Sequence, residues 1–333
     1  MNNIPKWYDA QHDFDLGYTL NIIIGARGYG KTYGYLKILE SLPSSFIYAR
    51  RTQKQIDLSC SPQMSPFKSL NTDIGNDFRI ESHGEFCSIV DYTEEPPKER
   101  GYGIALSTFA NMRGVDFNDV ETMLYDEFMR AKSDRPIKGE ADAFFNLIET
   151  INRNREFKGR TPMRIFMCTN STSLDNPILQ QLGVIPVIEK MIIDKEEYHF
   201  NNYKSMMIHL ADSKDFAEEK RKTFLYKLTQ GTQFSAHALD NEFAYDSFYN
   251  IRRRPIAEYK PICGIDGIYI YRHKSKKEYY ACRSRAICEE YTEKDNLDLF
   301  RRKYGLRFRE LMTCGYMYYS EFEIKMRLTE YLK

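Results

Sequence analysis

The stretch from Gly25 to Thr32 reads G-A-R-G-Y-G-K-T and directly follows the apolar run Thr19–Ile24. This is the phosphate-binding loop pattern G-x-x-x-x-G-K-[ST], in which glycines let backbone N–H groups converge on phosphate oxygens. Residues 31–41, after the loop, carry a helical pattern of apolar residues. A strand, a glycine loop and a helix in this order predict a P-loop fold. The alternative, a glycine turn that only caps a helix, does not need the strand before it.

The loop also supplies candidate ligands for a nucleotide and its metal ion. We expect Lys31 to pair with the β and γ phosphates of ATP and the Thr32 hydroxyl to bind Mg²⁺. The residues expected to bind ATP are Gly25, Ala26, Arg27, Gly28, Tyr29, Gly30, Lys31 and Thr32.

An acidic pair is expected to complete this site. The predicted strand Glu121–Phe128 carries Asp126 and Glu127 near its end. ATP hydrolysis needs one carboxylate for Mg²⁺ and one for the attacking water. We therefore assign Asp126 to the metal ion and Glu127 to the water. The order Asp-Glu favours the additional-strand, catalytic-glutamate class of ATPases, and two acids that merely end a strand are the alternative.

Further candidate catalytic groups follow two other predicted elements. Asn170 comes after the predicted strand Met163–Thr169, where it would sense the γ phosphate or simply start the next turn. Arg153 and Arg155 end the predicted helix 139–155. From a neighbouring subunit, they could stabilise charge that develops on the phosphoryl group. Both also suit the carboxyl end of a helix, and this second explanation stays open.

Strands and helices alternate through most of the chain. Further strands are predicted at 45–51 and 103–107, and a hairpin at 78–92. This order predicts an α/β fold in which helices sandwich a mainly parallel sheet.

The pattern changes toward the C-terminus. A charged helical stretch at 213–228 indicates a linker. Strands at 259–271 and 278–283 and helices at 296–314 and 322–331 then indicate a small α+β domain. The predicted division is an ATPase domain at 1–208, a helical linker at 209–243 and a C-terminal domain at 244–333.

Membrane association and export are not expected. No apolar run approaches the roughly 20 residues of a membrane span. The N-terminus lacks the apolar core of a signal peptide. We expect a soluble, unexported protein with no membrane partner.

Five stretches together resemble the DNA-packaging ATPases of small phi-twenty-nine-type tailed phages, which are related to large-terminase motors. The resemblance runs from residue 22 to about residue 243 and keeps the order of its motifs. Its stretches are Ile24–Thr32, Phe46–Arg51, Tyr125–Phe128, Arg153–Glu156, and Arg221–Thr223 with Leu239–Asn241.

The resemblance implies a homomeric ring, usually a pentamer, that moves double-stranded DNA into a preformed capsid. Partners would be the capsid portal and a scaffold RNA, and the location would be the host cytoplasm, transiently at the viral prohead. By position, Arg153 matches the arginine that acts on the ATP of a neighbouring subunit, and Arg113 is a weaker match to a second such cation. The C-terminal domain would resemble a degenerate RNase H-like nuclease.

Positive charge at the C-terminal end is consistent with a nucleic-acid partner. Residues 251–333 hold 19 Lys and Arg against 12 Asp and Glu, a net charge of +7. A motor that moves duplex of any sequence must contact phosphates. Solvated surface charge is the other explanation for each candidate. The candidate DNA contacts are Arg51, Lys54, Arg252, Arg253, Arg254, Lys274, Lys276 and Lys277.

Three alternative functions stay open from the sequence. A helicase or another translocase of the same clade would share every nucleotide-site residue. A terminase-like nuclease would use the C-terminal domain, where Gly264–Gly267, with Asp266, resembles the first catalytic strand of an active nuclease. An ATP-binding scaffold would bind the nucleotide without turnover.

Overall fold

The computed structural model describes residues 7–84, 86–112, 115–130, 134–170, 173–211, 214–230 and 250–332. The chain divides into two compact units. The large unit holds residues 1–182 and 191–245, and the C-terminal unit holds residues 183–190 and 246–333. The three-part division into 1–208, 209–243 and 244–333 stays a prediction.

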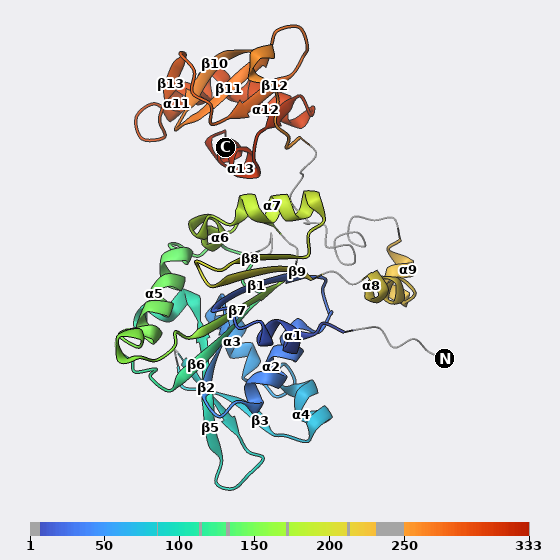
Figure 1. Ribbon diagram of the computed structural model, residues 1–333, viewed down its shortest axis with the longest axis vertical. Helices are drawn as coiled ribbons and strands as arrows, with labels where there is room; N and C mark the ends of the chain where they lie inside the picture. Colours follow the sequence, from blue (N-terminus) through green and yellow to red (C-terminus); the bar gives the residue numbers. More distant parts are fainter. Residues whose placement is uncertain are drawn as a thin grey trace. The chain divides into compact units, whose positions relative to one another are not determined.

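Within the described residues, the large unit contains a nine-stranded, mainly parallel sheet (Figure 1). The strand order is β3-β4-β5-β2-β6-β7-β1-β9-β8. The run from β5 to β9 is parallel, and β3, β4 and β8 pair antiparallel at the two edges. The strands are β1 Leu20–Gly25, β2 Ser45–Arg50, β3 Phe78–Ser82, β4 Phe86–Asp91, β5 Lys98–Ala105, β6 Val120–Asp126, β7 Arg164–Thr169, β8 Tyr198–Asn201 and β9 Met206–Ala211.

Helices cover both faces of this sheet. Apolar residues of α1 to α4 share one core cluster with Ile23, Leu124 and Phe166. On the opposite face, the ring of Phe144 in α5 stacks on Tyr125 of β6, with centroids 5.8 Å apart. The helices are α1 Ala10–Asp15, α2 Lys31–Ser41, α3 Gln53–Ser59, α4 Lys68–Ile74, α5 Glu140–Asn152, α6 Pro177–Leu182, α8 Lys214–Arg221 and α9 Phe224–Leu228, while α7 Ile185–Asp194 spans the boundary between the units.

Because central strands are buried on both faces, they form largely apolar runs instead of alternating. Ile22, Ile23 and Ile24 of β1 are at most 1% exposed. The predicted α/β sandwich is therefore confirmed.

Two predicted helices differ from the observed ones. The helix predicted at 139–155 ends at Asn152, because Arg153 has a φ of 41° and leaves the helical conformation. The stretch predicted at 213–228 forms two helices, α8 and α9, and Thr223 is the N-cap of the second. A Thr in extended conformation at that position favours a new helix start.

The C-terminal unit is a small α+β domain, as predicted. Its described residues form a five-stranded sheet in the order β13-β10-β11-β12-β14. Phe300, Phe308 and Leu328 from the helices pack with Ile265 and Ile270 from the strands. The strands are β10 Tyr259–Ile265, β11 Ile268–His273, β12 Tyr279–Cys282, β13 Glu289–Tyr291 and β14 Met317–Tyr319, and the helices are α11 Leu297–Phe300, α12 Leu306–Thr313 and α13 Phe322–Tyr331.

Asp266 lies in a hairpin turn. The segment predicted as one strand at 259–271 is the hairpin β10–β11, and its two turn residues, Asp266 and Gly267, have φ of 43° and 78°. Two-residue hairpin turns favour Asp-Gly because both positions need positive φ. Asp266 Oδ2 also accepts a hydrogen bond from Glu293 N at 3.0 Å. The hairpin turn thus accounts for an Asp at position 266 without a catalytic role.

A polar cluster joins the N-terminal helix α1 to strands β8 and β9. Asp13 in α1 has no exposed surface, and His209 in β9 is 5% exposed. Asp13 Oδ2 lies 2.6 Å from His209 Nδ1 and accepts from Tyr8 Oη at 2.5 Å, and Asp13 Oδ1 accepts from Tyr198 Oη at 3.0 Å. Burial and the nearby acid raise the pKa of Tyr8, so that its hydroxyl stays a donor. One carboxylate therefore pairs with two buried groups, from Tyr8 and His209, and with the partly buried Tyr198.

Asp13→Ala is expected to destabilise the large unit by about 3–5 kcal/mol, because it leaves buried polar groups without their shared acceptor. Urea unfolding followed by circular dichroism measures this free energy. Asp15→Ala is the matched control on the same helix: Asp15 is exposed, and its loss should change stability by about 0.5 kcal/mol or less. Equal stability of the two variants would contradict the assigned role of Asp13.

No helix in the described parts of the chain is long and apolar enough to cross a membrane.

Candidate nucleotide site

Four parallel strands end at one edge of the large sheet. β1 ends at Gly25, β2 at Arg50, β6 at Asp126 and β7 at Thr169. The registers place Ile24 opposite Thr169, and Asp126 opposite Cys168. In open sheets of this kind, ligands bind outside the carboxyl ends of the strands. Residues that are far apart in the sequence therefore meet at one place.

The glycine loop between β1 and α2 has the backbone that phosphate binding requires. Gly28 and Gly30 have φ of 75° and 99°, a region that side-chain-bearing residues rarely adopt. Lys31 follows at the start of α2, and its Nζ donates to the carbonyl oxygens of Gly25 at 2.8 Å and Ala26 at 2.9 Å. Asn170 Oδ1 accepts from the same ammonium at 3.4 Å. The sequence-predicted loop, lysine and polar strand end thus lie together.

Burial affects the charge of Lys31. Its side chain is almost completely enclosed, and desolvation lowers its pKa to about 8, although Cys168 and Asp126 act in the opposite direction. An anion at the loop would favour the charged form. The ammonium is therefore placed where a phosphate would stabilise it.

Thr32 and Asp126 provide oxygen donors for a metal ion. Thr32 Oγ1 donates to Asp126 Oδ1 at 2.8 Å, so the hydroxyl and the carboxylate face the same point. Hard oxygen ligands of this kind suit Mg²⁺, which also keeps waters and phosphate oxygens in its shell. The residues therefore fit the predicted ion.

Arg50 contacts both predicted catalytic acids, and we did not predict this from the sequence. Its Nη1 lies 2.8 Å from Asp126 Oδ2, and its Nη2 lies 2.6 Å from Glu127 Oε2. The hydroxyl of Tyr48 approaches the same Asp126 oxygen at 3.3 Å. Arg50 is the last residue of β2, the strand next to β6, and its place at the end of a predicted apolar strand was an available signal in the sequence. The single positive charge of Arg50 partly compensates the two acids that would serve the metal ion and the water.

Glu127 has an unusual backbone. Its φ is 50°, and non-glycine residues in this region are uncommon and often occur at functional sites. Its side chain is 46% exposed, whereas that of Asp126 is only 7% exposed. Water can therefore reach Glu127 but has little access to Asp126, which agrees with their different predicted roles.

Arg51 is not available to DNA, and this prediction was wrong. Its side chain has no exposed surface. It binds Glu140 through two hydrogen bonds, Nε to Oε1 at 2.7 Å and Nη2 to Oε2 at 3.1 Å, and lies 3.5 Å from Asp134. Glu140 is the first residue of α5. Adjacent residues of a strand point to opposite faces, so Arg50 reaches the acids while Arg51 anchors a helix.

Arg153 and Arg155 lie at the other edge of the sheet. The exposed Arg153 donates through Nη2 to the carbonyl oxygen of Val115 at 2.6 Å. Arg155 is buried and donates to the carbonyl oxygen of Val120, the first residue of β6. Asp126 is at the opposite end of that strand, about 20 Å away. Arg155 thus holds the chain's own backbone, and a trans role for it is corrected to a structural one.

A second lysine reaches the glycine loop from α8. Lys220 Nζ donates to the carbonyl oxygen of Arg27. Phe216, one turn earlier in α8, packs its ring 5.1 Å from that of Tyr29. Arg27 itself is exposed, whereas Ala26 and Tyr29 are buried. The sequence carried no signal that this helix returns to the loop.

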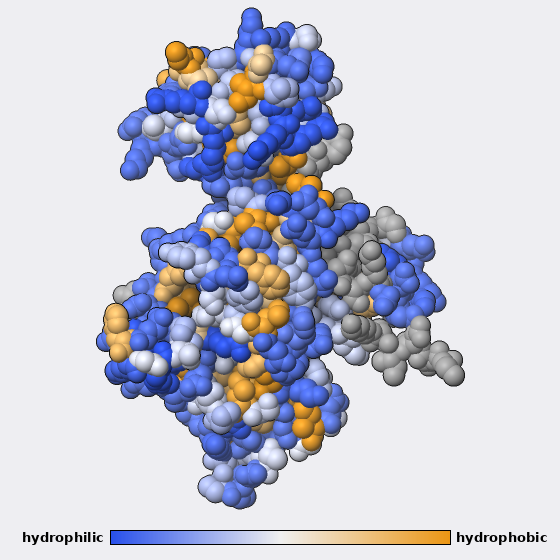
Figure 2. All heavy atoms as spheres, viewed as in Figure 1, coloured by the Kyte–Doolittle hydropathy of each residue, from blue (hydrophilic) through white to orange (hydrophobic). Residues whose placement is uncertain are grey.

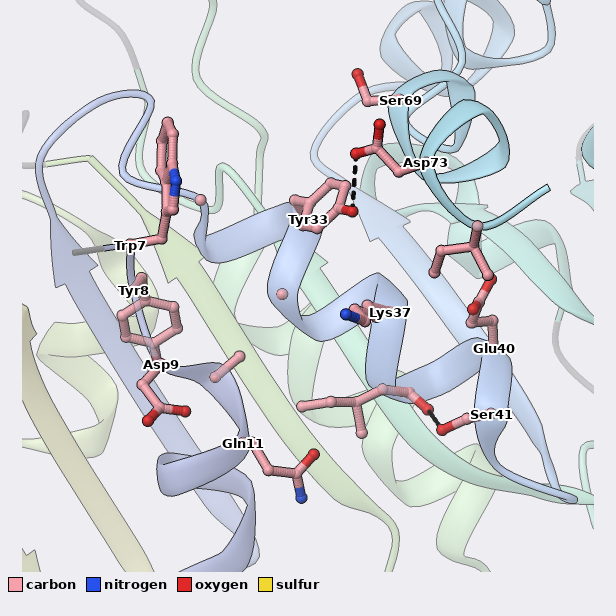
Figure 3. Close-up of a pocket in the computed structure, with 15 residues that line it drawn as sticks. Trp7, Tyr8, Asp9, Gln11, Tyr33, Lys37, Glu40, Ser41, Ser69 and Asp73 are labelled. Carbon is pink, nitrogen blue, oxygen red and sulfur yellow. Dashed lines mark hydrogen bonds between the residues drawn. The ribbon is translucent and has the colours of Figure 1, made fainter. Parts of the chain in front are cut away.

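A hollow of about 960 Å³ flanks α2 beside the loop (Figure 3). Trp7 and Gly30, the last residue before α2, line the hollow. Tyr33 points toward Asp73, to which its hydroxyl donates at 2.9 Å. Lys37 and Glu40 continue the lining along α2. The hollow is thus lined by the aromatic rings of Trp7 and Tyr33 and by the charged groups of Lys37, Glu40 and Asp73.

The remaining candidate DNA contacts are exposed cations except Arg254, which is only partly exposed and lies 3.6 Å from Glu278. In the C-terminal unit, Arg252 and Arg254 lie over the ring of Tyr318 at 5.0 and 4.1 Å, and Lys277 lies over Tyr316 at 4.7 Å. We call these residues the basic tyrosine face. The surface of this unit is largely hydrophilic in the view of Figure 2. Lys54, Arg253, Lys274 and Lys276 are also exposed.

Some predicted features lie outside the described residues. These are Arg113 and the stretch Leu239–Asn241. In the described residues, no group of three or more His, Cys, Asp or Glu could hold a metal ion.

Comparisons with known proteins agree on one family. The family model for "Podovirus DNA encapsidation protein (Gp16)" matches residues 4–261. The DNA packaging protein of Bacillus phage B103 is 33% identical over 245 residues, which cover 71% of this chain and 67% of that protein. The DNA packaging protein of Bacillus phage PZA is 29% identical over 257 residues, covering 74% and 69%.

Solved structures support the same architecture. The bacteriophage Phi-29 viral genome packaging motor assembly has a chain that aligns with a TM-score of 0.68 and 21% identity, covering 98% of this chain and 99% of that one. This likeness shows a shared fold over both units. The family match, which spans the glycine loop, both acids and the predicted linker, reaches well beyond half of the sequence, so the chain belongs to the podovirus DNA encapsidation protein family.

Proposed function

We propose that this chain is the ATP-hydrolysing subunit of a ring-shaped motor that moves double-stranded viral DNA into a preformed capsid. One observation carries the proposal: the glycine loop, Lys31, Thr32, Asp126 and Glu127 converge at the carboxyl edge of one sheet. Membership in a DNA encapsidation family indicates that the substrate of the motor is DNA. The ring, the portal and a scaffold RNA as partners are part of the proposal.

The chemistry follows from the positions of these groups. Lys31 and the loop N–H groups would bind the β and γ phosphates of ATP. Thr32 and Asp126 would hold Mg²⁺, which neutralises charge on those phosphates. Glu127 would accept the proton of the attacking water, for which its Oε2 must leave Arg50, now 2.6 Å away. Asn170, beside Lys31, would contact the γ phosphate.

Glu127→Gln is expected to reduce ATP turnover by about 100-fold or more while ATP binding is retained, because it removes the base without removing phosphate ligands. Phosphate release and equilibrium binding measure the two quantities. Glu121→Gln is the matched control, since Glu121 is an exposed acid of the same strand. Wild-type turnover in Glu127→Gln would reject the assignment. A wild-type protein that binds ATP without turnover would indicate the scaffold alternative.

The placement of Arg153 supports a site shared between subunits. Arg153 is exposed, and Arg155, two residues later, is bonded to Val120 at the start of β6, about 20 Å along that strand from Asp126. This position favours a contact of Arg153 with a nucleotide bound to another chain. A neighbouring chain whose nucleotide edge faces Arg153 would receive the guanidinium, which stabilises charge on the transferred phosphoryl group.

Mixed rings test this arrangement. Arg153→Ala and Glu127→Gln subunits are each expected to be inactive alone. In an equal mixture, an Arg153→Ala subunit beside a Glu127→Gln subunit regains a complete site, so about a quarter of wild-type activity should return. Arg160→Ala, at an exposed arginine near the same edge, is the control and should stay active alone. A mixture no more active than its parts would rule out action in trans.

The basic tyrosine face is the DNA contact that the structure favours. Arg252 and Lys277 are exposed cations whose positions are restricted by tyrosine rings. Such groups suit phosphates of any sequence, and their attraction weakens with salt because counterions are released.

Arg252→Ala with Lys277→Ala is expected to weaken duplex binding equally for unrelated sequences. The slope of log affinity against log salt should become less negative by about 2, since two phosphate contacts are lost. Fluorescence anisotropy at several salt concentrations measures both effects. Lys303→Ala is the control in the same unit, because Lys303 is paired with Glu289. An unchanged slope would show that this face is solvated surface.

The rival functions have less support. Asp266, the residue that suggested a nuclease, is explained by its hairpin turn. A helicase would share the nucleotide site, but membership in a DNA encapsidation family favours packaging.

A further inference from the structure

Lys220 holds the glycine loop in the same manner as the lysine of the motif. Lys31 Nζ donates to the carbonyl oxygens of Gly25 and Ala26, and Lys220 Nζ donates to that of Arg27. The two lysines are far apart in the sequence. Two ammonium groups thus lie on consecutive carbonyl groups of one loop.

The position of Lys220 is fixed by its surroundings. Its Nζ lies 5.2 Å from the ring centroid of Phe216 and 5.3 Å from that of Tyr226. Phe216 packs against Tyr29 of the loop and, at 5.5 Å, against Trp7. At Gly28, a Cβ atom would lie 3.3 Å from Lys220 Nζ. The bare backbone of the loop therefore leaves room for this ammonium.

Positive charge around the loop is incompletely compensated. Burial lowers the pKa of Lys220, and the charge of Arg27 lowers it further. Lys220 in turn acts against the charged form of Lys31. A neutral carbonyl oxygen stabilises an ammonium less than a phosphate oxygen does, because hydrogen bonds between ionised groups are stronger. A polyanion at the loop would compensate all three side chains.

We propose that Lys220 is a phosphate ligand of the nucleotide site, supplied by α8 from outside the P-loop sequence. When ATP binds, its ammonium exchanges the Arg27 carbonyl oxygen for an oxygen of the outer phosphates. This inference rests on the proposed ATPase function and adds a residue to it. DNA phosphate is the other source of the same chemistry, and the location at the glycine loop favours the nucleotide.

The test uses Lys220→Met in the full chain, because methionine keeps the apolar stem near Phe216 and Tyr226 but removes the charge. ATP affinity, measured by titration calorimetry with Mg²⁺ at low salt, is expected to fall roughly 10-fold or more. Lys220→Arg should bind nearly as well as wild type. Lys222→Met is the matched control, because Lys222 is 65% exposed and paired with Glu219. It should bind as wild type does.

Salt separates a charge contact from a packing effect. The difference between wild type and Lys220→Met should shrink as salt rises, since screening weakens the lost attraction. Three results would overturn the inference: equal ATP affinity at low salt, a loss that salt does not change, or weakened duplex binding with ATP affinity intact. These results leave the proposed function standing if Lys31→Ala abolishes ATP binding. Absence of ATP binding in the wild type would overturn both.

Discussion

Charge buried at the edge of a sheet must be compensated locally, and this requirement organises the large unit. Lys31, Arg51 and Asp126 are all at most 6% exposed as whole residues. Each has partners at hydrogen-bonding distance: loop carbonyl oxygens for Lys31, Glu140 for Arg51, and Thr32 with Arg50 for Asp126. An uncompensated ion in such a place would cost several kcal/mol. Lys31, Thr32 and Asp126, whose charges and hydrogen bonds are compensated in this way, are also the residues that would bind the phosphates and the metal ion.

Two consecutive arginines divide this task because a strand alternates its faces. Arg50 turns to the acids of β6, whereas Arg51 turns to the start of α5. A buried ion pair adds little net stability compared with well-packed apolar residues. What Arg51 and Glu140 supply is position, since two parallel hydrogen bonds hold the start of α5 against the end of β2. The two arginines at the end of β2 thus position both the acids of the site and the start of α5.

The sequence predicted the parts of the site that local chemistry determines. The structure brings the glycine loop, Lys31 and Thr32 together with the acids that follow an apolar strand. The spacing of the loop motif fixes its local geometry, and the acids meet it because their strand ends at the same edge of the sheet. Arg51 was assigned to DNA and Arg50 was given no role, because the sequence of a short basic pair does not show which face of the sheet each side chain takes. Lys220 was missed because its contact depends on where α8 packs, about 190 residues after the loop.

The large unit also has an asymmetry that suits a ring. Its phosphate-binding groups gather at one edge of the sheet, where Glu140 at the start of α5 is bonded to Arg51. The helix has 13 residues and is about 20 Å long, and the exposed Arg153 follows its last residue. In a two-fold dimer, a single interface would have to hold both nucleotide sites and both arginines at once. A head-to-tail contact brings unlike edges together, and repeating it by rotation closes a ring in which every interface holds one complete site. The length of α5 therefore separates Arg153 from the phosphate-binding groups of its own chain, and this separation suits the head-to-tail ring that we propose.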